Sequence, residues 1–139
     1  MSQKFRIHGE FLFQREGQVL ITTVRGPWNL EFSKEWQEQI TPEAIALAAS
    51  GNWAAMTIIT ESILCTPEAL EHMRAEALLG VQKMRFVALA FVVSNEVTGH
   101  GLLDRSYENL YKDVCPFRIF ETTEDAKIWL ANYVDMGGR

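Results

Sequence analysis

The sequence predicts an α/β fold: a mixed, mostly parallel five-stranded sheet with four helices, in the order β-β-α-β-α-β-α-β-α. Residues 53–60 and 86–93 are almost continuously apolar, which is typical of parallel strands buried on both faces. A helical pattern separates them, and repeated strand-helix-strand units require parallel pairing with right-handed crossovers. Residues 4–14 instead alternate polar and apolar side chains, which indicates a half-buried antiparallel strand.

The first two strands form a predicted hairpin. The alternation over residues 4–14 is broken only at Leu12. Residues 15–18 are a polar turn that contains Gly17, which tolerates a positive φ, and residues 19–24 resume a β-rich composition. Two strands joined by so short a turn pair antiparallel.

The first helix begins after Asn29, a residue type that caps helix N-termini well. Three apolar residues follow at spacings of four on one helical face: Phe32, Trp36 and Ile40. Pro42 stands within this segment and, with Thr41 before it, has the signature of a new helix start. We expect a kink or restart there, with a second short helix through Ala49.

Three more helices alternate with the remaining strands. Thr66 and Pro67 form a cap and first-turn proline, Pro116 stops the next helix before a short strand at 117–120, and Thr123 opens the last helix. Their apolar faces are Leu70, Met73, Ala77 and Val81; then Leu103, Tyr107, Leu110 and Tyr111; then Ala126, Trp129, Leu130, Tyr133 and Val134.

Composition restricts the classes of function. The 139 residues predict one domain over 1–136 with a frayed tail at 137–139. A net charge of −5 without a basic block argues against nucleic-acid binding, and the longest apolar run, eight residues, is shorter than the ~20 that cross a membrane. With two cysteines and no signal-peptide pattern, we expect a cytoplasmic protein.

Two segments together resemble a known family. The first is Gly26-Pro27-Trp28-Asn29, after the second strand. The second is residues 118–130, in which an aromatic residue is followed by an acidic turn, an alanine and the pair Trp-Leu. They are similar to segments of the SpoIIAA-like proteins, relatives of the STAS domain of anti-sigma-factor antagonists and sulfate transporters. The resemblance implies a right-handed superhelix of β-α turns, and a small binding or regulatory module.

The resemblance breaks at the phosphorylation site of the antagonists. Their turn into the second helix carries Asp-Ser-Ser/Thr-Gly-Leu, in which a partner kinase phosphorylates a serine. The equivalent residues 66–70 read Thr-Pro-Glu-Ala-Leu, with no hydroxyl at either acceptor position. Thr66 itself is expected to cap the helix, so we predict that this turn is not phosphorylated.

Ligand sites in open, mostly parallel sheets lie beyond the carboxyl ends of the strands. The loops there supply the candidate ligand- or partner-binding residues, which are Arg25, Trp28, Glu61, Ser62, Asn95, Glu96 and His100. Trp28 is either a rigid ring that anchors a ligand or a staple folded back on its own helix.

The same loops permit an enzymatic alternative with Cys65 as nucleophile, His100 as base and Glu96 as the residue that orients it. A helix that starts after Cys65 would favour the thiolate form of this residue. The alternative interpretation is that Cys65 has only a structural role, as a small apolar side chain packed under Leu64. The histidines lack metal-site spacing and His72 is expected at the surface. No cofactor or metal is therefore expected.

Two functional hypotheses result. The first is a non-enzymatic cytoplasmic STAS-like module that binds a partner protein or a small apolar ligand. The second is a small thiol-dependent or hydrolytic enzyme. Both faces of residues 53–60 and 86–93 are apolar, so helices on one side would leave a bare face. We expect a second copy of the chain, in a homodimer, to cover it in preference to a ligand, unless one helix crosses to that side.

Overall fold

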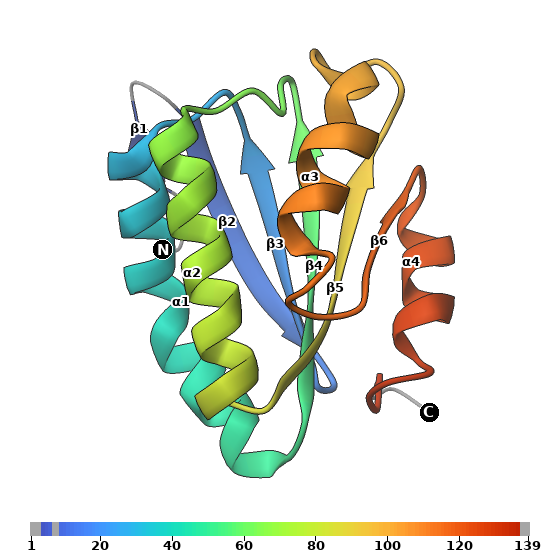
Figure 1. The fold of residues 1–139 in the computed structure, drawn as a ribbon. Helices are drawn as coiled ribbons and strands as arrows, with labels where there is room; N and C mark the ends of the chain where they lie inside the picture. The colour runs from blue at the N-terminus through green and yellow to red at the C-terminus, as the bar shows by residue number, and fades with distance from the viewer. Residues whose placement is uncertain (1–3, 7–8, 137–139) are drawn as a thin grey trace.

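Six strands form one sheet, in chain order, in the computed structural model, which describes residues 4–6 and 9–136 (Figure 1). The first strand pairs antiparallel with the second, and the second with the third. The remaining neighbours in the sheet pair parallel. The mixed, mostly parallel sheet is therefore confirmed. The strands are β1 (Lys4–Arg6), β2 (Gly9–Glu16), β3 (Val19–Arg25), β4 (Trp53–Thr60), β5 (Phe86–Val93) and β6 (Phe117–Phe120).

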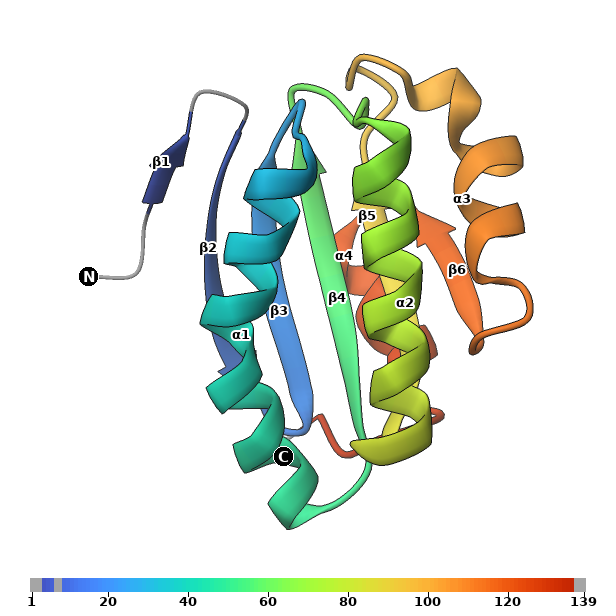
Figure 2. The ribbon, with the colours of Figure 1, turned by 60° about the vertical axis from the view of Figure 1, so that its left-hand side comes forward.

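Three of the four helices cover one face of the sheet, here called the front face, and the fourth covers the back face (Figures 1 and 2). A 3₁₀ turn, η1 (His100–Leu102), precedes the third helix. The helices are α1 (Leu30–Ser50), α2 (Pro67–Lys83) and α3 (Leu103–Tyr111) on the front and α4 (Thr123–Leu130) on the back. No helix in the described ranges is long and apolar enough to cross a membrane.

The predicted first strand is two strands in the structure. β1 pairs antiparallel with β2, with Phe5 opposite Glu10, and so adds a short sixth strand at the sheet edge. Directly paired residues share a face, and Lys4 pairs with Phe11, so the faces do not follow the alternation that one continuous strand would have. The tail at 137–139 lies outside the described residues.

The expected restart at Pro42 is wrong, because α1 continues through it as one helix. Proline removes the N–H that would bind the carbonyl of Glu38. Beside it, the Thr41 hydroxyl donates to the Gln37 carbonyl at 2.7 Å and accepts from the Gln37 side chain at 2.9 Å. Burial of Ala44 and Leu47 beyond the proline keeps the second half of the helix on the sheet.

The back face is covered within the chain, so the premise of the predicted homodimer is wrong. The inward residues of α4, Ala126 and Leu130, are fully buried against this face. The helix ends at Leu130, earlier than predicted, and Val134 packs on the same cluster from the following turn. The strand residues that they cover are Val19, Ile21, Ala54, Met56, Ala88, Ala90 and Val92.

Candidate functional site

The strand-end loops lie at one edge of the sheet, where backbone hydrogen bonds join them. Backbone bonds from Ile63 to Thr98 (3.0 Å) and from Thr98 to Glu61 (2.9 Å) join two of the loops. Arg25 Nε lies 3.5 Å from Glu61 Oε2, and both side chains are exposed. Asn95 and Glu96 are exposed and His100 is partly buried in η1, whereas Ser62 is buried and accepts from the backbone N–H of Leu64 at 3.1 Å.

Trp28 belongs to the core and not to an accessible loop. Its side chain is 2% exposed, and its indole N–H donates to Met73 Sδ at 3.4 Å. The ring centroids of Phe32 and Trp36 lie 6.3 and 6.4 Å from that of Trp28, so the ring folds back on α1. The Trp28 backbone also pairs with the loop before α2, donating to the Leu64 carbonyl at 3.1 Å.

Cys65 is held as a thiol. Burial raises its pKa above the ordinary value, and its Sγ lies 3.3 Å from the Tyr107 hydroxyl. That hydroxyl donates to the carbonyl of Ile63 at 2.8 Å, which leaves its oxygen to accept from the thiol. Across residues 61–101, where all three candidates lie, no hydrogen bond or ion pair joins Cys65 to His100 or Glu96. The enzymatic arrangement is not assembled.

The helix start after Cys65 forms as predicted. Thr66 caps α2, accepting from the Ala69 backbone N–H at 3.2 Å, with Pro67 in the first turn. The loop after β3 packs against the loop after β4 at Gly26. A glycine is required at this position, because a Cβ there would collide with the Ser62 carbonyl. In the part of the chain that the structure describes, no group of three His, Cys, Asp or Glu side chains could hold a metal ion.

A predominantly apolar hollow lies elsewhere, between α1 and α2 over the middle of the sheet. It is a cavity of about 220 Å³ with predominantly apolar walls. Its lining comes from α1 and α2 on the sides and from β3, β4 and β5 on the floor, with Tyr111 from α3. None of the seven predicted site residues lines it. Ala55, in the middle of β4, is only partly buried because the cavity lies above it.

Two threonines stand side by side on the apolar floor of the cavity. Thr22 on β3 and Thr57 on β4 are direct neighbours in the parallel pairing of these strands. Both are buried, with 3% and 4% of their surface exposed. The floor positions around them are apolar, and they are Leu20, Ala55, Leu89 and Phe91.

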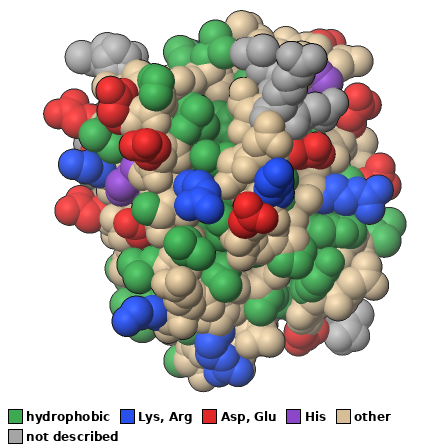
Figure 3. Space-filling view, viewed as in Figure 1, with side chains coloured by type: hydrophobic (Ala, Val, Ile, Leu, Met, Phe, Trp, Pro, Cys, Tyr) green, Lys and Arg blue, Asp and Glu red, His purple; other side chains and the backbone are tan. Residues whose placement is uncertain are grey.

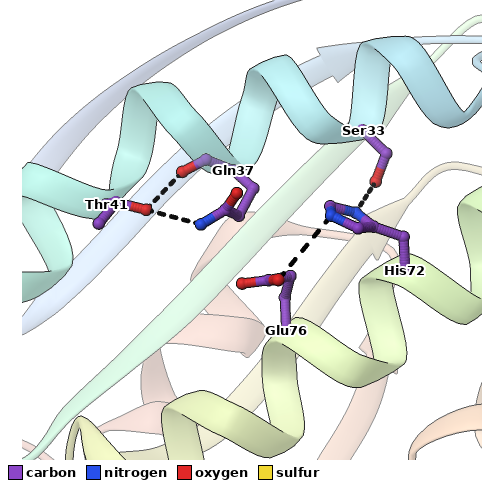
Figure 4. A network of polar contacts seen from close by, with 5 residues as sticks. All are labelled: Ser33, Gln37, Thr41, His72 and Glu76. Carbon is purple, nitrogen blue, oxygen red and sulfur yellow. Dashed lines mark hydrogen bonds and ion pairs between the residues drawn. The ribbon is translucent and has the colours of Figure 1, made fainter.

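Polar side chains of the lining meet between the two helices, with the sheet behind them (Figure 4). Ser33 Oγ on α1 lies 3.0 Å from His72 Nδ1 on α2, and the other ring nitrogen of His72 lies 3.8 Å from Glu76 Oε2. Gln37 and Thr41 form the second pair of contacts along α1. His72, expected at the surface, therefore links the two helices at the cavity.

Among the described residues that line the cavity there is no lysine or arginine, and the one carboxylate is that of Glu76. On the outer surface in the view of Figure 1, acidic and basic side chains alternate with small hydrophobic patches, and no large area of one charge forms (Figure 3). The one acidic side chain of the described lining is therefore that of Glu76.

Known proteins confirm the fold. The chain is similar to a solved structure, an uncharacterised protein of the DUF3478 family from Shewanella loihica PV-4 that is described as having a SpoIIAA-like fold. The TM-score is 0.53 at 22% identity, over 94% of this chain and 98% of that one. No family model matches this chain, and no curated protein does either. The fold is thus SpoIIAA-like, as the sequence resemblance implied.

Proposed function

We propose that this chain is a non-enzymatic binding module that takes a small apolar ligand into the cavity between α1 and α2. The cavity itself carries the proposal, because ligand sites are concave, mostly apolar and equipped with a few polar groups. A dry apolar cavity of about 150 Å³ is large enough for benzene. At about 220 Å³, this one has room for a fused bicyclic ring or a short chain.

A small ligand has more structural support than a protein partner. Protein-binding surfaces present contiguous apolar patches. Here the exposed large apolar side chains are spread over separate elements, as Leu12, Ile45, Leu64, Leu79, Ile128 and Tyr133. The homodimer is not part of the proposal, since α4 covers the face that suggested it. A cytoplasmic location is part of it, supported by the unpaired thiols of Cys65 and Cys115.

Naphthalene is a suitable probe, since it is apolar and close in size to the cavity. Titration should shift the methyl NMR signals of Ala55, Met73 and Ala77, which line the cavity, and saturate at one site. Ala77→Phe should abolish these shifts by filling the space. The matched control is Ala75→Phe, since Ala75 is exposed on the same helix and does not line the cavity.

The result that would overturn the proposal is also specific. If naphthalene moves no cavity methyl, or if Ala77→Phe and Ala75→Phe leave the same affinity as the unaltered protein, the cavity is not a binding site. Both variants are to be checked for cooperative thermal unfolding, so that a misfolded protein does not count as loss of binding.

A further inference from the structure

We infer that the natural ligand of this cavity is a neutral, largely apolar molecule that carries one oxygen acceptor, such as a ketone or an alcohol, and not a carboxylate. The inference rests on the proposed binding function and specifies its ligand class. Three features of the lining lead to it: the threonine pair on the floor, an unpaired indole N–H, and the absence of a cation.

The threonine pair is chemically out of place on this face. A buried hydroxyl needs a hydrogen-bond partner, and without one it costs about 1–3 kcal/mol. Thr22 and Thr57 lie next to each other in register, and both line the cavity. Each hydroxyl can donate one hydrogen bond. A ligand oxygen above the pair would accept from them.

Trp36 adds a third donor to the same cavity. Its side chain lines the cavity, and its Nε1–H is buried with no acceptor among the described residues. Native structures rarely leave buried donors unpaired, and those that remain call for an explanation such as an absent ligand. The front face thus offers donors and needs an acceptor oxygen.

The charges of the lining decide against a carboxylate. Burying an ionised carboxylate is costly unless a cation pairs with it. The lining residues that the structure describes include no lysine or arginine, and the ring of His72 already lies between Ser33 Oγ at 3.0 Å and Glu76 Oε2 at 3.8 Å. A second carboxylate would also be repelled by Glu76. A neutral oxygen meets the donors without this cost.

The experiment compares 2-octanone with octanoate at pH 8, where a carboxylic acid of ordinary pKa, about 4–5, is ionised. Affinities are measured from the methyl shifts of Ala55 and Ala77, with naphthalene as a reference ligand lacking oxygen. We expect 2-octanone to bind at least about tenfold more tightly than octanoate, a difference of about 1.4 kcal/mol.

The threonine pair is tested by the double variant Thr22→Val with Thr57→Val, which replaces each hydroxyl with a methyl group of similar size. Affinity for 2-octanone should fall about fivefold to tenfold, the effect of losing one net hydrogen bond, while affinity for naphthalene is kept. The matched control is Thr23→Val, because Thr23 pairs with Ile58 on the back face of the sheet and does not line the cavity.

Each outcome has one meaning. Octanoate that binds as tightly as 2-octanone overturns the inference, and so does a double variant that keeps its affinity for 2-octanone. In both cases naphthalene still binds, so the proposed function survives. If naphthalene and 2-octanone both fail to bind, the proposed function fails, and the inference falls with it. Retained naphthalene binding shows that the double variant is folded.

Discussion

The two faces of the sheet are both apolar, yet they are packed differently. On the back face, small residues let α4 approach closely: Ala54, Ala88, Ala90 and Ala126 are all fully buried. On the front face, large rings such as Trp36, Trp53, Phe86 and Phe91 stand between the helices and the strands. No residue of the back-face cluster lines the cavity, which lies wholly on the front.

The comparison shows how side-chain volume, and not hydrophobicity, leaves room for a ligand. Cores close at crystal-like density where facing side chains interdigitate. The front face combines rings with small residues, Ala55, Ala77 and Gly80, that do not fill the space between them. The same strands thus provide a tightly packed support on one side and a cavity on the other.

The largest predicted effect removes a back-face anchor. Leu130→Ala should destabilise the protein by about 2–5 kcal/mol, because this fully buried side chain would leave a void under α4. Urea unfolding measures the loss. Ile128→Ala is the control, since Ile128 is 70% exposed on the same helix and should change stability by less than about 0.5 kcal/mol. Equal losses would mean that α4 does not pack as described.

The second prediction inserts the same side chain on each face. Ala90→Leu should cost about 1–3 kcal/mol by overpacking the fully buried back face. Ala55→Leu extends into the cavity instead, so its cost should be within about 0.5 kcal/mol of zero, and it should weaken naphthalene binding. Thermal unfolding of both variants checks this. A larger cost for Ala55→Leu would contradict the cavity.

The third prediction compares the helix caps of the two faces. Thr66→Ala at α2 and Thr122→Ala at α4 should each cost about 1 kcal/mol, because each hydroxyl accepts from a backbone N–H at 3.2 Å. Thr123→Ala, one residue inside α4, is the control and should cost less. A Thr66→Ala variant as stable as the unaltered protein would show that the cap is unimportant for α2.

The smallest effect concerns the strand-end edge, where the enzymatic hypothesis placed its nucleophile. Burial raises the pKa of Cys115 to about 11 and that of Cys65 in the same direction. Both thiols should therefore react slowly with iodoacetamide at pH 7–8, much more slowly than in urea. Rates measured by mass spectrometry check this, and rapid native labelling of Cys65 that His100→Ala abolishes would restore the enzymatic hypothesis.

The same shift has a consequence for stability. A thiol whose pKa is higher in the folded protein than its ordinary value of 9.0 favours folding while it stays protonated. For Cys115 this contribution is complete below pH 9 and is lost as the pH rises towards 11. The midpoint temperature of thermal unfolding should therefore decrease as the pH rises from 9 to 11. In the Cys115→Ser variant this decrease should be smaller. An unchanged fall in that variant would assign the effect to other groups.

Sequence alone determined the elements that depend on short-range patterns. The strands at 53–60 and 86–93 lie within their predicted bounds, and the caps at Asn29 and Thr66 form as expected. The parallel order followed from alternating strands and helices. These features were predictable because hydrophobic period, capping and turn chemistry are set by residues a few positions apart.

Only the tertiary structure decided where the site lies. Thr22 and Thr57 stand 35 positions apart and become neighbours through the pairing of β3 with β4. His72 meets Ser33 only because α1 and α2 lie side by side, and burial of Trp28 depends on Met73 in α2. The threonines interrupting two apolar strands were the one visible signal. A periodic pattern shows which residues share a face, whereas a cavity depends on volumes contributed by distant elements.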